Sequence, residues 1–322
     1  MHCTQTTRCL ALTVAYDGTG YHGFQVQCAE HGPTIQGSLE KVWFQLFEES
    51  IRFTPAGRTD AGVHAAGQVV SFRTGARIPT DKVGKAMNSL LPRDIRVLEV
   101  WETRADFNAR FSACWKRYDY WVDNRRVPDV FMRRNAYHEP VPLNLAAMRW
   151  EAKALIGRHN FRAFAASHGA SRHYERTLSH CMVFEEENRF FEERTERRFS
   201  EECGLLRMSF VGDGFLYHMV RIIAGTLVGC SREEPLGEFR VRQTGKEAET
   251  MAAVLASRDR THAGETLPPH GLILRHVEYQ ARRPSDVFAD LPDSEWEESL
   301  VAPRGSYISD IDSGNDACLF EG

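Results

Sequence analysis

Residues 9–16, Cys-Leu-Ala-Leu-Thr-Val-Ala-Tyr, have the alternation of a β-strand with one buried face, on which Leu10, Leu12, Val14 and Tyr16 would lie. Glycines at positions 18, 20 and 23 follow and predict a tightly turned loop. Thr34 then stands where a helix N-cap is expected. Apolar residues recur after it at helical spacing, at Ile35, Leu39, Val42 and Leu46. The chain therefore opens with a strand, a loop and a helix.

The same rhythm continues through the rest of the chain. Further strands are expected at 51–54, 67–73, 94–101, 115–122, 178–185, 204–211 and 272–279, and further helices at 79–90, 143–156, 217–229 and 247–257. Strand–helix–strand–strand–helix–strand, twice over, predicts an α+β fold of two ferredoxin-like (RRM-like) halves. We expect one half in residues 1–110 and the other in 111–280. We expect their sheets to join into one mostly antiparallel sheet, flanked by helices, with a basic cleft between the halves.

Composition excludes several classes of protein. Of the 322 residues, 42% are hydrophobic and 26% are charged, the balance of a globular protein. There is no apolar run long enough for a transmembrane helix and no apolar signal region at the N-terminus, so we expect a cytoplasmic protein. None of the eight cysteines forms a C-x-x-C pair. Cys28 and His31 have ligand-like spacing but no second pair, so neither disulfides nor a metal site is expected.

The charge is distributed unevenly. Residues 281–322 hold ten acids and three arginines, whereas residues 102–180 hold 14 Lys or Arg against 8 Asp or Glu. A locally basic body suits a polyanionic partner, although a basic stretch is often only a solvated surface. We expect residues 281–322 to be an acidic, disordered tail. The Glu/Arg-rich segment 185–202 has the composition of an exposed hairpin extension.

The stretch Gly57-Arg58-Thr59-Asp60-Ala61-Gly62-Val63-His64-Ala65 carries the chemistry. It lies between two expected strands, and its glycines allow the backbone to approach a ligand closely. Asp60 has two interpretations from local physics: an ordinary turn in which it bonds its own backbone, or a catalytic carboxylate. Arg58 could bind a phosphate or insert among bases.

This stretch resembles the signature of the TruA-type tRNA pseudouridine synthases, and further motifs follow in the order of that family. They are Tyr16 to Gln25 (YDGTGYHGFQ), Thr34 to Glu40 (TIQGSLE), Gly67 to Phe72 (GQVVSF), Asn88 to Ile95 (NSLLPRDI), Phe107 to Ala113 (FNARFSA), Lys116 to Tyr120 (KRYDY), Phe215 to Arg221 (FLYHMVR), Asp259 to Thr261, and Gly271 with Leu272. The resemblance covers roughly residues 10–280. Several ordered motifs identify a family far better than one short pattern does.

The resemblance implies an isomerase that converts uridine to pseudouridine without a cofactor or a metal. It implies tRNA as the partner, with targets in the anticodon stem-loop (tRNA positions 38–40), and a homodimer. Asp60 would be the catalytic carboxylate, Arg221 its partner and Tyr118 the active-site tyrosine that stacks on the flipped uracil. Arg58 would fill the space that the uridine leaves, and His64, Asn108 and Arg110 are further candidates for RNA contacts. Pro55 departs from relatives that carry a cysteine there, which excludes a nucleophilic cysteine at that position.

Two alternatives stay open at this point. A non-catalytic RNA-binding protein could use the same pair of sheets, although no RNP1 run is present. A nucleoside or glycoside hydrolase would need two carboxylates, and the motifs supply one, Asp60.

Overall fold

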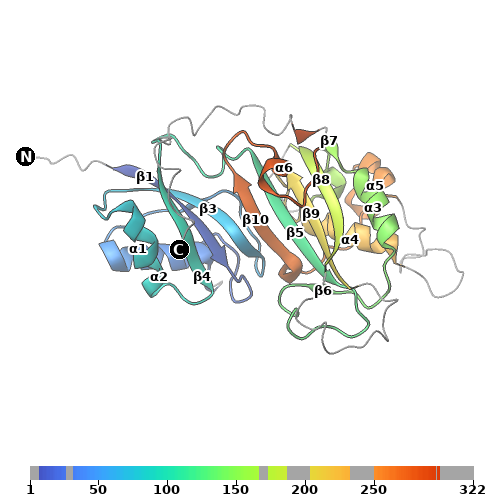
Figure 1. The fold of residues 1–322 in the computed structure, drawn as a ribbon, viewed down its shortest axis with the longest axis horizontal. Coiled ribbons are helices and arrows are strands. Elements are labelled where there is room, and N and C mark those ends of the chain that lie inside the picture. The colour runs from blue at the N-terminus through green and yellow to red at the C-terminus, as the bar shows by residue number, and fades with distance from the viewer. Residues whose placement is uncertain are drawn as a thin grey trace, which may run out of the picture.

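The computed structural model describes residues 7–26, 32–166, 173–186, 204–232, 250–294 and 296–297. Within these residues, ten strands form one sheet, in which eight lie in the order β4-β1-β3-β10-β5-β9-β8-β7 while β2 pairs with β3 and β6 with β5. Figure 1 shows this sheet running through the whole molecule. The sequence therefore predicted the fold class correctly, including the joining of the two sheets.

The N-terminal half has the strand order of a ferredoxin-like unit. Its elements are β1 (Arg8–Tyr16), α1 (Ile35–Phe47), β2 (Thr54–Pro55), β3 (His64–Thr74), α2 (Thr80–Leu90) and β4 (Ile95–Thr103). β1 pairs antiparallel with β3 and β4, and β2 pairs antiparallel with β3. Counted within this half, the order is 4-1-3-2. The side chain of Thr34 accepts a hydrogen bond from Gly37 N, which confirms the expected N-cap of α1.

The C-terminal half repeats this order. Its elements are β5 (Trp115–Asp123), β6 (Tyr137–His138), α3 (Leu145–Lys153), β7 (Gly157–Asn160), β8 (Glu175–Glu186), β9 (Leu205–Gly212), α4 (Met219–Ser231), α5 (Met251–Ser257) and β10 (Leu272–Glu278), with 3-10 turns at Arg162–Phe164, Arg260–His262 and Pro269–Gly271. β10-β5-β9-β8 again reads 4-1-3-2, and β7 extends the edge beyond β8. The short strands β6 and β7 were not predicted. The division near residue 110 stays a prediction.

The two halves join where β10 lies between β5 and β3. β10 pairs antiparallel with β5 and parallel with β3, at Ile273–His64 and Leu274–Ala65. Gly67 allows the strands to approach, because a Cβ built on it would lie 2.7 Å from the carbonyl oxygen of Arg275 on β10. The loop with Asp60 thereby sits at the junction between the halves.

The strand expected at 51–54 is wrong for most of its length. Only Thr54 and Pro55 pair with β3. The backbone of Phe53 instead bonds α1 side chains, with its N–H donating to Glu40 and its carbonyl oxygen accepting from Gln36. Those two bonds replace the pairing with a neighbouring strand.

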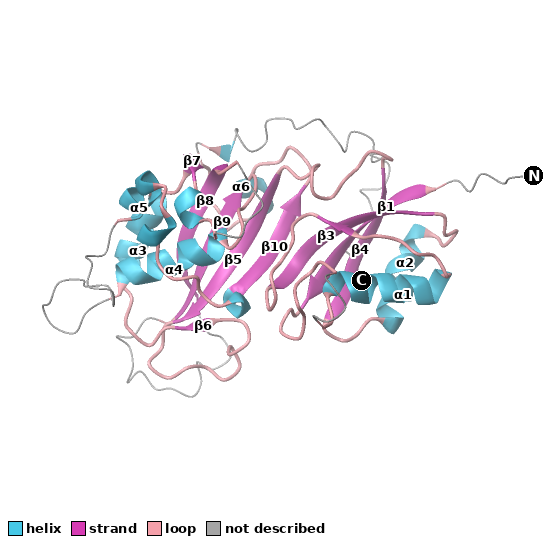
Figure 2. Cartoon of the chain, turned by 180° about the vertical axis from the view of Figure 1, so that it is seen from behind, coloured by secondary structure: helices cyan, strands magenta, loops and turns pink. Residues whose placement is uncertain are grey.

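The two faces of the C-terminal half of the sheet are covered differently. Helices α3, α4 and α5 lie on one face, as seen from behind in Figure 2, and α6 (Pro284–Val287) lies on the other, in front of the sheet in Figure 1. Tyr118 and Tyr120 of β5 belong to the core under the helices, whereas Trp115 of β5 packs with Val211 and Leu291 on the opposite face.

Residues 281–294, together with 296 and 297, form what we call the C-terminal strap. Trp115 Nε1 donates a hydrogen bond to the carbonyl oxygen of Arg282 at 2.9 Å, and His180 Nε2 donates to that of Pro292 at 2.7 Å. Asp290 pairs with Arg117 of β5 at 2.9 Å. The expectation of disorder from residue 281 is therefore wrong for the strap, because partly buried hydrogen bonds and an ion pair anchor it to the sheet.

Other expectations lie outside the described residues. These are most of the Glu/Arg segment 185–202, the tail beyond residue 297, and the Cys28–His31 pair. Among the residues that are described, no helix is long and apolar enough to cross a membrane.

Candidate active site

Asp60 lies in the loop between β2 and β3, and backbone contacts from the first loop of the chain fix that loop. Phe24 N donates to the carbonyl oxygen of Thr59 at 3.0 Å, and Gly62 N donates to that of Tyr21 at 3.3 Å. Gly62 has a φ of 78°, in the left-handed region that glycine adopts without strain. These hydrogen bonds join the loop after β1 to the Asp60 loop, so each loop stabilises the other. This explains why the glycine-rich motifs of the two loops occur together.

Side chains beneath the loop hold it from within the sheet. The hydroxyls of Tyr16 and Thr59 are hydrogen-bonded at 2.8 Å, and Gln68 Nε2 donates to the carbonyl oxygen of Gly57 at 2.7 Å. Burial raises the pKa of Tyr16 to about 12, so its hydroxyl stays protonated. Tyr16 and Gln68 were not singled out from the sequence, and their role is to position the Asp60 loop.

The Asp60 carboxylate meets Arg221, which lies in the first turn of α4. Arg221 Nη1 lies 3.4 Å from Asp60 Oδ2, and the two side chains are 12% and 27% exposed. This bonding brings together residues 161 positions apart in sequence. The guanidinium places a positive charge beside the carboxylate in a partly buried site. α4 is otherwise almost entirely buried, so an isolated charge there would be costly.

The fork shape of a guanidinium would allow two nitrogens to bind Asp60, but only Nη1 of Arg221 does so. Arg221 Nε donates instead to the carbonyl oxygen of Leu267 at 2.7 Å, and Leu267 N donates to the carbonyl oxygen of Arg221 at 3.3 Å. The arginine is thereby anchored to the segment before β10 and offers Nη1 to the carboxylate.

The second contact to Asp60 comes from His218, a residue that the sequence analysis missed. His218 Nε2 lies 3.3 Å from Asp60 Oδ2. Burial lowers the pKa of His218, with Asp60 opposing the shift and Arg221 and Arg260 adding to it, so the ring is neutral at pH 7. A neutral ring can donate from Nε2 to the carboxylate.

The backbone and a neighbouring ring hold His218 in place. It has a φ of 59°, an uncommon conformation for a residue other than glycine, and it precedes the first residue of α4. Its ring stacks on Tyr217, with ring centroids 3.8 Å apart. We expected the helix to run through this position, and a helical histidine there would have shown no sign of an active-site role. The departure from helical geometry is the kind of local strain found at functional sites.

Tyr118 of β5 lies beside the same loop. Its ring packs edge-on against Phe215 with centroids 5.0 Å apart, and a Cβ built on Gly57 would lie 3.4 Å from its hydroxyl oxygen. Burial, with the nearby Tyr16 and Asp60 adding, raises the pKa of Tyr118 well above its usual value. The hydroxyl is therefore a phenol at neutral pH and can donate a proton, not accept one as a phenolate.

His64, a candidate for RNA contact, holds the structure together instead. It is 3% exposed. Its Nδ1 accepts from Gly18 N at 3.0 Å, and its Nε2 donates to the carbonyl oxygen of Arg134 at 2.7 Å. Because both ring nitrogens bond backbone groups in the protein interior, the ring is not free to bind RNA in this arrangement.

Of the remaining candidates, Arg58 and Arg110 are exposed and Asn108 is half-buried. Arg58 is exposed on the Asp60 loop itself. Asn108 lies between β4 and β5 and uses its side-chain oxygen to accept from Arg110 N at 2.9 Å, which closes a turn. Arg110 is exposed, with its guanidinium 5.5 Å from the centre of the Phe111 ring. All of these residues are described, and none of them is hydrogen-bonded to Asp60.

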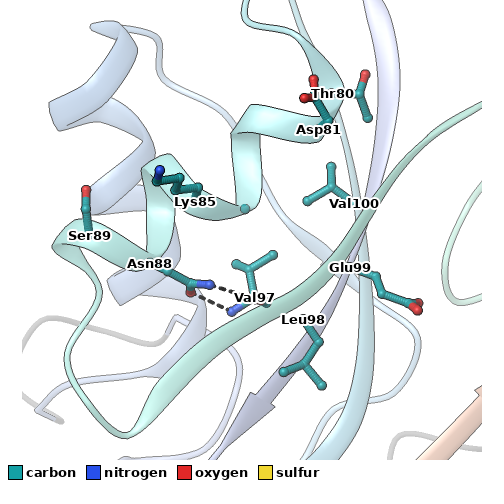
Figure 3. A pocket seen from close by; sticks show the side chains of 10 residues that line it. Thr80, Asp81, Lys85, Asn88, Ser89, Val97, Leu98, Glu99 and Val100 are labelled. Carbon is teal, nitrogen blue, oxygen red and sulfur yellow. Dashed lines mark hydrogen bonds between the residues drawn. The ribbon is translucent and has the colours of Figure 1, made fainter. Parts of the chain in front are cut away.

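A surface hollow of about 620 Å³ lies elsewhere, between α2 and β4. Figure 3 shows its lining side chains, with the amide of Asn88 hydrogen-bonded to the backbone of Val97 at 2.7 and 2.8 Å. Those bonds tie α2 to β4. None of the candidate residues lines this hollow, so we assign the chemistry to the Asp60 loop.

Among the described residues, no group of three or more His, Cys, Asp or Glu side chains is arranged to hold a metal ion. The only basic side chains that contact Asp60 in the described part of the chain are those of Arg221 and His218. The site thus consists of one carboxylate, one guanidinium, one neutral imidazole and one phenol.

The fold and this set of side chains define an α+β protein with a single carboxylate at the junction of two ferredoxin-like halves. The family model described as tRNA pseudouridine synthase matches residues 12–112 and 152–280, and the chain belongs to that family.

Curated relatives agree with the family match. A tRNA pseudouridine synthase A from Moorella thermoacetica is 44% identical over 271 residues, which cover 84% of this chain and 99% of the relative. The protein of that name from Syntrophomonas wolfei is 42% identical, over 84% of this chain and 97% of the relative. That from Halalkalibacterium halodurans is 40% identical, over 82% and 90% respectively.

Proposed function

We propose that this chain isomerises uridine to pseudouridine in transfer RNA, with Asp60 as the carboxylate that acts at the ribose. The observation that carries the proposal is the geometry around Asp60, whose Oδ2 lies 3.4 Å from Arg221 Nη1 and 3.3 Å from His218 Nε2. This geometry occurs in the loop that carries the family's Gly-Arg-Thr-Asp motif. The family match and the names of the relatives support the reaction and the substrate.

The reaction needs only groups that this chain supplies. The bond between ribose C1′ and uracil N1 breaks, the uracil turns, C5 joins C1′, the C5 proton leaves, and N1 takes up a proton. Atoms and electrons balance within one nucleotide, so no oxidant, reductant or co-substrate is required. Asp60 would stabilise or capture the positive charge that develops at C1′, or remove a ribose proton. The arrangement is compatible with each of these routes.

Tyr118 supports the uracil during its rotation. Its ring faces the loop from β5, where a flipped base could stack on it. Because its pKa is raised by burial, the hydroxyl acts as a hydrogen-bond donor at neutral pH and is a poor base for the C5 proton.

The RNA would reach Asp60 with the uridine flipped out of its stem. C1′ is not accessible within a paired helix, so extrusion of the nucleotide is required. Arg58 is exposed on the same loop and would fill the vacated space, while Arg110 with Phe111 would contact the strand nearby. We further propose the anticodon stem-loop as the target, a homodimer as the active form and a basic cleft as the path of the RNA.

The test is pseudouridine formation in an unmodified tRNA transcript, measured by mass spectrometry of the digested RNA. Wild-type protein should convert at least one uridine, and Asp60→Asn should lose essentially all turnover while it still binds tRNA. Substantial residual turnover of Asp60→Asn would remove Asp60 from the chemistry.

The same assay separates the alternatives. Binding by the wild-type protein without any pseudouridine would support a non-catalytic RNA-binding protein. Release of free uracil would support a hydrolase.

A further inference from the structure

The connection between β5 and β6 is a hydrogen-bonded surface loop, which we call the arginine loop and define as residues 125–136. It projects at the lower side of the sheet in Figure 1. Asp123, at the end of β5, accepts from Asp129 N at 2.7 Å and from Arg125 Nε at 2.6 Å. Phe131 N donates to the side chain of Asp129 at 2.8 Å. The loop is therefore held in one shape by its own polar groups.

That shape turns cationic and apolar side chains outward. Arg126, Arg133 and Arg134 are exposed, and the Phe131 side chain is 68% exposed. Val127 and Val130 are exposed as well. The only acid in the loop is Asp129, whose side chain is 6% exposed and pairs with Arg125 at 3.2 Å. Interleaved arginine and apolar side chains with no exposed acid are complementary to a nucleic acid, which offers phosphates and base faces together.

The arginine loop is attached directly to the candidate active site. The carbonyl oxygen of Arg134 accepts from His64 Nε2 at 2.7 Å, and the side chain of His270 is hydrogen-bonded to the backbone of Ala136. His64 begins β3, four residues after Asp60. A ligand seated over Asp60 would therefore have this loop beside it.

We propose that the arginine loop is a tRNA-binding element, in which Arg133 and Arg134 contact phosphates and Phe131 packs on a base or a ribose next to the flipped uridine. The inference rests on the proposed function and extends the contact surface beyond the residues of the Asp60 loop. Charge decides in favour of RNA over a second copy of the chain, because the loop exposes three arginines and no carboxylate.

The experiment compares steady-state kinetics on a tRNA transcript for three variants of the full chain. Arg133→Ala/Arg134→Ala should raise KM for tRNA about tenfold and leave kcat within about twofold. Phe131→Ala should raise KM by a similar factor, since each stacked base contributes substantially to affinity. Arg133→Lys/Arg134→Lys keeps the charges and should retain most of the affinity.

Binding is measured separately in the Asp60→Asn background, where turnover cannot interfere. The slope of log affinity against log salt concentration should fall by about 1.4 to 1.8 in the double alanine variant, because two phosphate contacts each contribute about 0.7 to 0.9. Arg283→Ala is the matched control, since Arg283 is an exposed arginine on the strap, across the sheet from α4. It should bind tRNA as the wild type does.

Three outcomes would overturn the proposal. They are an unchanged KM and salt slope in all loop variants, an equal loss of affinity in Arg283→Ala, and a change from dimer to monomer, measured by light scattering, that accounts for the loss. A wild-type protein that binds tRNA through this loop but forms no pseudouridine would refute the proposed reaction and leave the binding inference intact.

Discussion

Asp60 receives both of its side-chain contacts on one oxygen, from residues three positions apart at the start of α4. The resemblance to the family implied the arginine partner, and the apolar helix around Arg221 agrees with it, because an isolated charge there would be costly. The sequence could not predict the histidine, since the position of His218 depends on a left-handed backbone that the pattern of apolar residues does not reveal. The sequence also could not predict that Arg221 binds Leu267 as well as Asp60, because the acceptor at Leu267 is a backbone carbonyl oxygen, which every residue has.

Replacing Arg221 by lysine tests its double role. We expect kcat to fall at least about a hundredfold, because an ammonium cannot bond the Leu267 carbonyl oxygen and Asp60 in the same geometry. Arg149→Lys is the control, since Arg149 also donates through Nε to a backbone carbonyl oxygen, that of Val183, but has no contact with Asp60. Single-turnover rates measure the effect, and near-normal rates for Arg221→Lys would exclude Arg221 from the site.

Two substitutions of His218 distinguish a positioning bond from a backbone effect. Glutamine can reach Asp60 and donate to it, whereas asparagine tolerates the left-handed backbone but is too short. If the bond to Asp60 is what matters, His218→Gln should keep kcat within about threefold and His218→Asn should lose about tenfold, at unchanged KM. The opposite ranking would show that only the backbone conformation of this residue is required.

At the scale of elements, periodicity located the long strands and helices because each has one continuous buried face. It failed for β6 and β7, which are only two and four residues long. It also failed for the strap, whose prolines, serines and acids suggest disorder, while its attachment depends on single anchors such as Leu291 and Asp290. Such anchors do not recur at a regular spacing in the sequence. They can be recognised only once their partners on β5 and β8 are known.

The strap should loosen as the solution becomes acidic. Burial lowers the pKa of His180, while Glu297 and Asp290 oppose the shift and Arg117 adds to it. The unfolded chain, with an ordinary histidine pKa near 6.5, then takes up the proton first as pH falls. The stability contribution of neutral His180 is therefore present above pH 6.5 and is lost as pH decreases below that value.

Urea unfolding at pH 7.5 and pH 5.5 measures this effect. The loss of unfolding free energy between the two should be smaller in His180→Gln than in the wild type, by up to about 1.4 kcal/mol per pH unit. His22→Gln, at an exposed histidine, should behave as the wild type does. Equal losses in His180→Gln and the wild type would contradict this account. The strap carboxylate Asp290 has a lowered pKa and titrates below this range.

At the scale of the molecule, the sequence predicted two repeated halves and a joined sheet but not which strands would join them. The join depends on the absence of a side chain at Gly67, which lets β3 approach β10. A single glycine in a strand is compatible with several structural roles. The role of Gly67 could therefore be assigned only once the position of β10 was known.

Gly67→Ala should disturb both stability and catalysis. The added methyl would lie 2.7 Å from the Arg275 carbonyl oxygen, so the strands must separate, at a cost of about 1–3 kcal/mol. kcat should fall together with Tm, because Asp60 and Arg221 come from opposite sides of this join. Gly229→Ala, in α4 with no heavy atom within 4 Å of the added Cβ, should keep kcat and should not lower Tm, because alanine favours a helix more than glycine does. A Gly67→Ala protein with wild-type Tm and kcat would show that β3 and β10 can accommodate a methyl group at this position.

Among the strands that the structure describes, β10 is the last to be synthesised, although it lies in the middle of the sheet. Until residues 272–278 leave the ribosome, β5 and the start of β3 each present an edge with unsatisfied backbone groups. A growing chain is consequently open to edge-to-edge association late into translation, and a ribosome-bound fragment cannot yet modify RNA. The time until β10 emerges, or protection of the open strand edges by a chaperone, should therefore determine the yield of active protein more than the folding rate of either half does.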